Sequence, residues 1–348
     1  MLGGVGAATR GKGNVHDGAY DRRVMRAVSV TRNGGPEVLK VVEVNDPVAA
    51  PGQVVVTVTA AGVNYMDTYA RIGRPGYDAP TPFVLGGEGA GRVLAAGVGV
   101  EGFEAGQRVA WKSARGSYAE RVAVSAAELV HLPDGVSDET GAAVLLQGVT
   151  AHYLLHSTYA VQAGDTIVVH AAAGGVGLLL TQMAAALGAR VVGTASTEEK
   201  AVLALEAGAT EVVRYDRDSV PDRVRELTAG EGVAAVYDGV GRATFEDSLR
   251  CLRPRGVLVA FGAASGPVPP FDIQRLAPAG SLYITRPTLA HYTRDRAELL
   301  GRANEVLGLV ATGRLRVHVG GRYPLDEAQQ AHRDLEGRAT VGKLLLLP

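Results

Sequence analysis

Short runs of alternating apolar and polar residues begin near residue 25 and continue to about residue 126, separated by turns rich in Gly and Pro. Gln53 to Ala60 is the clearest run, and it follows the turn signal Pro51-Gly52. Further strands are predicted at 92–95, 106–111 and 117–122. Strands this short, joined by tight turns, indicate a small β-rich domain.

From Asp165 onward, buried-type strands alternate with helices of about 10 to 14 residues, a pattern typical of βαβ units and a parallel sheet. Gly188 is placed to end the first helix, and Ser196 to Glu199 forms a capping box for the next one. The six predicted strands are 166–170, 190–194, 211–215, 234–238, 256–261 and 281–284. They suit the two halves of a doubly wound α/β sheet.

The segment after Arg286-Pro287 is more like the N-terminal part than like the βα repeats. It predicts a helix over 297–309, a strand over 315–319, a helix over 326–336 and an apolar end at 344–347. We therefore expect it to return and complete the first domain. The predicted domains are 25–147 with 290–348, and 148–289. Residues 1–24, rich in Gly, Ala and Arg, are predicted to be a disordered extension.

Composition narrows the class of protein. The chain has 348 residues and a formal net charge of -1, which provides no overall field for nucleic acid or an anionic membrane. The single cysteine, Cys251, excludes an intramolecular disulfide and a multi-cysteine zinc site, and we interpret it as structural. No apolar run reaches the roughly 20 residues that span a bilayer. We expect a soluble cytoplasmic protein.

A glycine-rich turn follows the strand 166–170 and opens a helix, with the spacing Ala172-x-Gly174-x-x-Gly177. In this context it predicts a dinucleotide-binding turn rather than a simple tight turn. Gly174 lets the backbone approach a pyrophosphate, and Gly177 lets the helix lie close to the strand. The N–H groups at the helix start would face the phosphates. The expected contacts are Ala173, Gly174, Gly175, Val176 and Gly177.

The end of the second strand favours NADPH. A site for NAD usually has Asp or Glu about 20 residues after the turn, and the chain has no carboxylate at Val192 to Ser196. Thr194, Ser196 and Lys200 are instead expected to accept a 2′-phosphate, although Lys200 also fits a solvated helix position. Tyr215 either lines the same pocket or covers the sheet.

The assembled motifs resemble those of the zinc-independent quinone oxidoreductases, the ζ-crystallin-like branch of the medium-chain dehydrogenase/reductase superfamily. The resemblance covers essentially all of 25–348. It rests on Ala61 to Tyr69, Gly86 to Gly91, His170 to Gly177 with Gln182, Tyr237 to Gly241, and Thr285-Arg286-Pro287. It implies a GroES-like catalytic domain formed from both chain ends, with a Rossmann domain inserted between them. It also implies cofactor contacts at Thr150, Val240, Gly241, Phe261, Gly262 and Arg338, the last of which could equally be a surface cation.

The same resemblance argues against a metal. Zinc alcohol dehydrogenases have a Cys ligand where this chain has Asn64 and a His ligand where it has Gly87, and a catalytic zinc needs three protein ligands. His152 and His156 lie at i and i+4 of a predicted helix. Without a third ligand we expect them to have packing or surface roles.

Two residues are candidates for catalysis. Without a Lewis acid, hydrogen bonds must polarise the substrate oxygen, or orientation must carry the hydride transfer. The Asn64 amide could donate to that oxygen or fix the nicotinamide ribose, or Asn64 could simply start a turn. Tyr69 could donate a proton, or pack. Tyr77 is a weaker candidate, and Asp67 is expected to tie the local turn.

The leading interpretation is a metal-free NADPH:quinone oxidoreductase. A reductase of conjugated C=C bonds in enals, enones or enoyl thioesters is the alternative. A third possibility is a non-catalytic NADPH-binding structural, sensor or RNA-binding protein, although no basic stripe indicates nucleic acid as a partner. The strand at 280–284 is expected at a sheet edge, where it would pair with its twofold mate in a homodimer.

Overall fold

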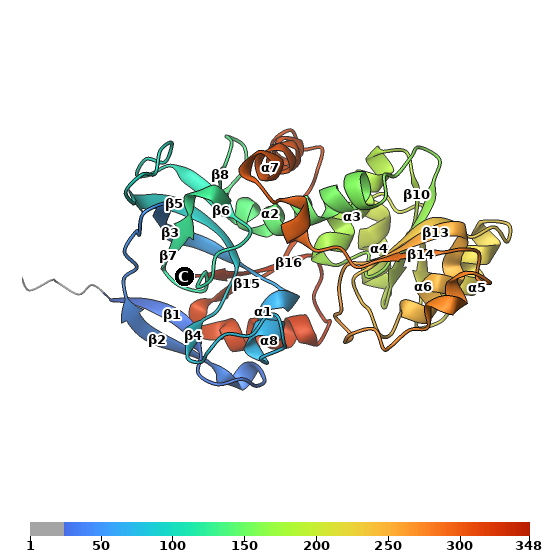
Figure 1. Cartoon of the computed structure of the whole chain (residues 1–348), viewed down its shortest axis with the longest axis horizontal. Coiled ribbons are helices and arrows are strands. Elements are labelled where there is room, and N and C mark those ends of the chain that lie inside the picture. The colour runs from blue at the N-terminus through green and yellow to red at the C-terminus, as the bar shows by residue number, and fades with distance from the viewer. Residues whose placement is uncertain (1–23) are drawn as a thin grey trace, which may run out of the picture.

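The computed structural model describes residues 24–348, which form two lobes joined by a buried helix (Figure 1). The predicted extension falls outside the described residues, except that Val24 already belongs to the first strand, β1 (Val24–Val30). Within the described range no helix is both long enough and apolar enough to cross a membrane.

The first lobe is built from strands that come from both ends of the chain, and they pair antiparallel except for β15 and β16, which are parallel. Its larger sheet has the order β15-β16-β3-β5-β6-β8, with β7 also paired to β3, and a smaller sheet has the order β2-β1-β4. The strands are β2 (Leu39–Asn45), β3 (Gln53–Val63), β4 (Phe83–Val84), β5 (Glu88–Ala96), β6 (Arg108–Trp111), β7 (Arg121–Ser125), β8 (Leu129–His131), β15 (Val319–Pro324) and β16 (Lys343–Leu347). β16 pairs with β3, so the C-terminal segment completes the sheet.

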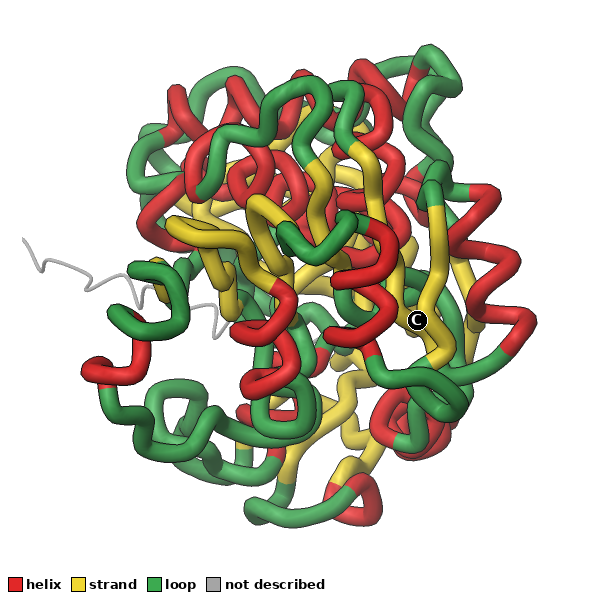
Figure 2. Tube along the Cα trace, turned by 90° about the vertical axis from the view of Figure 1, so that its right-hand side faces the viewer, coloured by secondary structure: helices red, strands yellow, loops and turns green. Residues whose placement is uncertain are grey.

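The second lobe contains a parallel sheet of six strands in the order β11-β10-β9-β12-β13-β14, as the alternating pattern predicts. Its strands are β9 (Thr166–Val169), β10 (Arg190–Ala195), β11 (Glu211–Arg214), β12 (Val233–Asp238), β13 (Leu252–Ala260) and β14 (Tyr283–Thr285). The helices α3 (Gly175–Ala186), α4 (Glu198–Glu206), α5 (Val220–Leu227) and α6 (Phe245–Cys251) cover this sheet (Figure 2). The strand order reverses between β9 and β12, which is where such sheets bind ligands.

A buried helix, α2 (Asp138–Tyr153), connects the lobes and continues as one π-helical turn, Leu154–Thr158. Its residues are apolar nearly all round, as expected for a helix covered on every side. They join one hydrophobic cluster that includes side chains of both lobes. The remaining helices are α1 (Tyr65–Arg71), α7 (Arg296–Ala311) and α8 (Ala328–Glu336).

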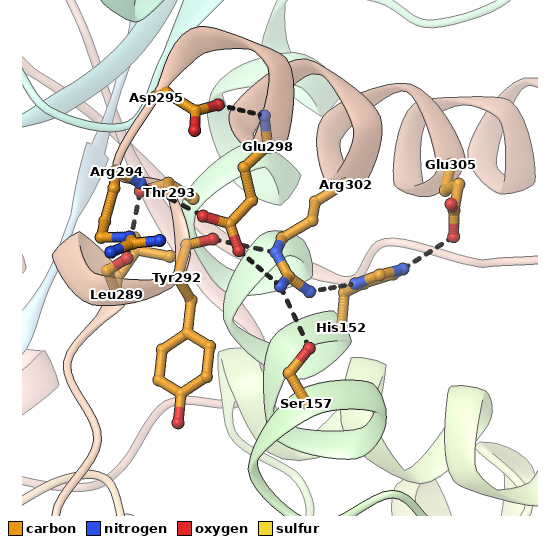
Figure 3. A network of polar contacts seen from close by, with 10 residues as sticks. All are labelled: His152, Ser157, Leu289, Tyr292, Thr293, Arg294, Asp295, Glu298, Arg302 and Glu305. Atoms are coloured by element: carbon orange, nitrogen blue, oxygen red, sulfur yellow. Dashed lines mark hydrogen bonds and ion pairs between the residues drawn. The ribbon is translucent and has the colours of Figure 1, made fainter.

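Arg302 on α7 forms hydrogen bonds with both segments that connect the lobes (Figure 3). Its guanidinium donates to Ser157 Oγ at 3.0 Å on the outgoing crossing and to the Tyr292 carbonyl at 2.9 Å on the returning one. It also donates to His152 Nδ1 at 3.2 Å. Because Arg only donates, the proton of neutral His152 lies on Nε2, which faces Glu305 at 2.7 Å.

Three predicted elements are wrong in position. The strand expected at 315–319 is β15 at 319–324, because the Arg316 N–H donates to the Gln182 side chain instead of a neighbouring strand. The strand expected at 117–122 is β7 at 121–125, which is fixed by its pairing with β3. The cap of α4 is Thr197, whose hydroxyl accepts from Lys200 N, and not Ser196.

The strand predicted at 92–95 begins earlier, at Glu88, inside the glycine-rich motif. Gly89 and Gly91 allow close packing there. A Cβ on Gly91 would lie 2.0 Å from the Thr57 carbonyl oxygen, and one on Gly89 would lie 2.5 Å from the Trp111 ring.

Candidate active site

The glycine-rich turn lies between β9 and α3, at the reversal of strand order. Gly174 caps α3 from an extended conformation, and its N–H donates to the Ala171 carbonyl at 2.9 Å. A Cβ on Gly177 would lie 2.3 Å from that same oxygen, so only glycine fits there. The first N–H groups of α3 have no acceptor within the helix, so the N-terminus of α3 favours an anion, although the bridge to Gly342 places the Gly342 carbonyl next to Gly175.

The C-terminal segment contacts this turn directly. The Gly342 N–H donates to the Ala173 carbonyl at 2.9 Å, and Gly174 and Gly342 form a parallel bridge. Lys200 Nζ donates to the carbonyl of Arg338, so the structure brings these two predicted cofactor residues together. Burial, with a contribution from the Arg338 charge, lowers the pKa of Lys200. Two adjacent cations at the end of β10 suit a phosphate.

The other residues predicted around the adenosine end have different settings. Thr194 is buried beneath the turn, where its hydroxyl contacts His170 Nδ1 at 3.1 Å and accepts from the Ala171 N–H. Ser196 is half-buried, and Tyr215 is about half exposed, at 49%. The structure therefore places Ser196 and Tyr215, but not the Thr194 hydroxyl, where a ligand has access.

The loops after β12 and β13 are held together by Asp238, a buried residue of the motif Tyr237 to Gly241, whose carbonyl accepts from the N–H groups of Phe261 and Gly262. Its carboxylate accepts from the N–H groups of Val240 and Gly241 at 2.8 and 2.9 Å. The predicted residues Phe261 and Gly262 pack on this turn, and a Cβ on Gly262 would lie 2.2 Å from the Gly239 carbonyl oxygen. The backbone around 239–262 is thus fixed beside the crevice.

Asn64 begins α1, and its backbone N–H donates to Asp67 Oδ2 at 2.8 Å, which confirms that Asp67 ties the local turn. The Asn64 side chain is buried and fully engaged. Its Nδ2 donates to the Gly62 carbonyl at 3.2 Å and to Glu88 at 3.1 Å, while its Oδ1 accepts from Gln147 at 2.6 Å and Lys343 at 2.7 Å. Asn64 could donate to a substrate oxygen only by giving up a partner.

Glu88 and Lys343 form a buried ion pair at 2.6 Å, with side-chain exposures of 0% and 3%. Glu88 also accepts from the Leu146 N–H at 2.8 Å on α2. The pair fixes the orientation of the Asn64 amide, because the Lys343 cation must face the oxygen and the Glu88 carboxylate must face the nitrogen. Sequence reasoning missed this pair. The one available signal was a lysine opening an apolar strand.

Gln147, on α2, extends this cluster towards the dinucleotide turn. Its Nε2 donates to Asn64, and its Cγ would lie 3.6 Å from a Cβ on Gly175. Among the described residues its Oε1 is buried without a hydrogen-bond partner. Thr150, also predicted as a cofactor contact, lies one turn further along α2 and donates its hydroxyl to the Leu146 carbonyl at 2.7 Å.

A second buried chain of polar groups anchors α1 to α8. Arg71 donates to His332 Nδ1 at 2.9 Å, so the proton of neutral His332 lies on Nε2, which faces the Tyr118 hydroxyl at 3.3 Å. Tyr118 in turn donates to Asp67 at 2.9 Å. Burial, reinforced by the Arg71 charge, lowers the pKa of His332 to about 3. Burial also raises the pKa of Asp67 to about 6, against the opposing hydrogen bonds from Tyr118 and Asn64.

Tyr69 lies on α1 and is half-buried. Burial raises the pKa of its hydroxyl, while the charges of Arg74 and Arg286 and the backbone N–H of Ala263 oppose that shift. Since Ala263 and Arg286 follow β13 and β14, the Tyr69 hydroxyl faces the second lobe. A tyrosine that stays protonated there can donate a hydrogen bond or a proton.

The two histidines at i and i+4 pack against each other, with ring centroids 4.4 Å apart, and His152 is held by Arg302 and Glu305. Within residues 24–348 there is no group of three His, Cys, Asp or Glu side chains arranged to hold a metal ion. Cys251 is buried, and burial raises its pKa to about 12, as expected of a structural cysteine.

The residues present fit a pyridine dinucleotide. The turn at 171–177 offers a helix N-terminus with a glycine whose Cβ would force the backbone to shift, and Lys200 and Arg338 supply positive charge near the end of β10. Across the crevice, α1 places Tyr69 opposite the loop that holds Ala263. A β-rich lobe combined with this parallel sheet and site defines a medium-chain dehydrogenase/reductase.

Comparison with known proteins agrees with this class. Residues 50–134 match the alcohol dehydrogenase GroES-like domain, and residues 175–303 match the zinc-binding dehydrogenase family. The chain is 46% identical over 317 residues to a quinone oxidoreductase of Pseudomonas aeruginosa, covering 90% of this chain and 97% of that protein. It is 41% identical over 333 residues to a 2-haloacrylate reductase of a Burkholderia species, covering 93% and 99%.

Solved structures show the same relationship. The crystal structure of Escherichia coli quinone oxidoreductase complexed with NADPH matches with a TM-score of 0.90 and 42% identity, over 93% of this chain and all of that one (100%). A mycobacterial protein complexed with NADPH matches with a TM-score of 0.90 and 50% identity, over 93% and 100%. The chain belongs to the quinone oxidoreductase family of the medium-chain dehydrogenases/reductases, and the predicted fold class is confirmed.

Proposed function

We propose that the protein is an NADPH-dependent oxidoreductase that reduces quinones without a metal ion. The observation that carries the proposal is the dinucleotide turn at the point where the strand order reverses. Beside this turn Lys200 contacts Arg338, at the place where an NAD-binding protein would usually have a carboxylate. Relatives that are named quinone oxidoreductases support it, and so do two similar solved structures that are complexed with NADPH, one of which is the Escherichia coli quinone oxidoreductase. Asn64 and Gly87 stand where the resemblance places zinc ligands, so we propose metal-free chemistry.

NADPH, when bound, would supply a hydride, and one proton from solvent would complete the reduction of a quinone to a hydroquinone and leave NADP+. The protein contributes orientation and electrostatics. The turn at 171–177 would hold the pyrophosphate, while Lys200, Arg338, Ser196 and Tyr215 would hold the 2′-phosphate end. Near the acceptor, the Tyr69 hydroxyl and the neighbouring Ala263 N–H are positioned to stabilise negative charge on the reduced oxygen. The buried pair of Glu88 and Lys343 would keep Asn64 and α1 in place.

The test is direct. Purified protein mixed with NADPH and 1,4-naphthoquinone should show a loss of absorbance at the nicotinamide band, faster with NADPH than with NADH. Clear binding of NADPH without turnover of any simple quinone would refute the proposal.

Reduction of a conjugated C=C bond is the second candidate. Burial keeps the Tyr69 hydroxyl protonated, so it can deliver a proton to carbon after hydride transfer. One relative, at 41% identity, is named a 2-haloacrylate reductase. Faster turnover of alkenals, acrylates or crotonyl thioesters than of quinones would favour this candidate over the first.

We further propose a cytoplasmic homodimer. β14 is the edge strand of the parallel sheet, and Tyr283 on it is 60% exposed, so its backbone offers a pairing edge to a second copy. Sedimentation at micromolar protein should give the mass of a dimer, and Tyr283→Arg should weaken it by placing like charges across the twofold axis. A monomer in both cases would refute the assembly without affecting the activity.

A further inference from the structure

Arg74 lies directly after α1, in a loop that folds back over Tyr69. Its backbone N–H donates to the Tyr69 carbonyl at 2.9 Å. Its guanidinium carbon lies 4.6 Å from the centroid of the Tyr69 ring and 5.9 Å from that of Tyr77. The two tyrosine rings meet edge to face at 5.3 Å. The three side chains therefore form one cluster, with a cation against two aromatic faces.

The charge of Arg74 has no anionic partner among the described residues. Neither a carboxylate nor any hydrogen-bond acceptor contacts its guanidinium within residues 24–348. Arg71, one turn earlier, shows the contrast: it donates to Glu336, His332 and the Gly34 carbonyl. An aromatic face compensates a cation only weakly, and it leaves the N–H groups at the guanidinium edge available to a planar anion.

The position of the cluster connects it with the reacting end of the crevice. The Tyr69 hydroxyl lies near Ala263 and Arg286 of the opposite lobe. Arg286 uses one Nη1–H on the Ala260 carbonyl at 2.8 Å and is otherwise exposed. Two arginines therefore flank Tyr69, and the charged groups that act on its hydroxyl are both cations. Asp78, the carboxylate next to Tyr77 in this loop, accepts from the Gly76 N–H at 3.0 Å instead of pairing with Arg74.

We propose that Arg74, stacked on Tyr69, is a subsite for the carboxylate of the acceptor substrate. The class of substrate is then a flat conjugated acid, such as a quinone bearing a carboxylate, whose ring lies against Tyr77 while its acid group pairs with Arg74. This inference rests on the proposed function, because it assigns the acceptor to the same crevice. It makes Arg74 a residue that determines specificity and not one that carries the hydride transfer.

The experiment compares a carboxylated 1,4-naphthoquinone with its methyl ester, which has nearly the same shape and no charge. The quantity measured is the ratio of their kcat/KM values with NADPH. In Arg74→Gln this ratio should fall about ten- to a hundredfold relative to wild type, the usual contribution of a charge-assisted hydrogen-bonded pair. Arg74→Lys should keep part of the preference, because it retains the charge but loses the bidentate geometry.

Arg333→Gln is the matched control. Arg333 lies exposed on α8 and donates only to Gln329, so the variant loses the same charge from the same lobe outside the crevice. Its substrate ratio should equal that of wild type. Competitive inhibition by 1-naphthoate and 1-naphthamide provides a second readout, in which Arg74→Gln should weaken only the naphthoate.

The outcomes separate the two claims. Equal ratios in wild type, Arg74→Gln and Arg333→Gln would overturn the anion subsite while leaving quinone reduction intact. A wild type that oxidises NADPH with neither quinone would refute the proposed function. In that case calorimetry of 1-naphthoate binding to the NADPH-loaded protein still tests the subsite. Binding that is lost in Arg74→Gln would support the subsite, and binding that is unchanged would overturn it.

Discussion

Replacing Lys343 with Met removes the cation from the buried Glu88 carboxylate while it keeps most of the apolar stem. In the variant, Glu88 retains the hydrogen bonds from Leu146 N and Asn64 Nδ2 at 2.8 and 3.1 Å but loses the ion pair at 2.6 Å. Removing one partner of a buried ion pair lowers the free energy of unfolding by about 3–5 kcal/mol. Because two donors still contact Glu88, we expect a loss near the lower end of this range, about 3 kcal/mol.

The loss should be measurable at pH 8 by equilibrium unfolding. Urea unfolding followed by the fluorescence of Trp111, the single tryptophan, reports this lobe because Trp111 is buried in β6.

Lys112→Met is the control. Lys112 is as buried as Lys343, but its partner Glu128 is 31% exposed and can rehydrate when the lysine is removed. That variant should lose about 1 kcal/mol or less. Adding Glu88→Gln to Lys343→Met should restore part of the loss, since a neutral amide removes the uncompensated charge. Equal losses in the two lysine variants at pH 8, or a further loss in the double variant, would refute the reasoning.

Three other outcomes are expected. Gly177→Ala should lower the free energy of unfolding by about 1–3 kcal/mol and weaken NADPH binding, because its Cβ would meet backbone at 2.3 Å; Gly87→Ala, with nothing within 4 Å, should unfold like wild type. His332→Asn should be most destabilising above pH 6.5, since a lowered His pKa gives stability that is lost as pH falls from the unfolded value towards about 3. Urea titrations at several pH values should show this penalty shrinking by up to ~1.4 kcal/mol per pH unit below 6.5. Lys200→Gln should reduce kcat/KM for NADPH about tenfold and leave that for NADH nearly unchanged; equal effects on both cofactors would remove Lys200 from the phosphate site.

Local patterns predicted the second lobe well, because its elements are specified by short-range signals. The alternation of strands and helices, together with Gly174 and Gly177, lies within one βα unit, where periodicity and turn chemistry suffice. The position of β15 could not be predicted in this way. The Gln182 side chain on α3 competes for its backbone, and that contact spans 134 positions.

The polar cluster around Asn64 was beyond sequence reasoning for the same reason. Its contacts to Glu88, Gln147 and Lys343 span 24, 83 and 279 positions. The motif alone identifies Asn64 as a candidate, but the hydrogen bonds that occupy its side chain come from distant segments and could not be predicted from the sequence. Arg74 was not singled out either, since an arginine in a Gly/Pro-rich loop looks like a solvated residue until its stacking on Tyr69 is seen.

The place of β16 in the sheet also affects how the protein is made. On the ribosome, the whole six-stranded sheet emerges before residues 343–347 do, so the nucleotide-binding lobe can fold while the other lobe still lacks its closing strand. Until then residues 61–63 of β3 lack their β16 partner and Glu88 stays without its cation. A nascent chain in this state exposes a strand edge to neighbouring chains and to chaperones. A truncation before Lys343 would hold the protein permanently in that unfinished state.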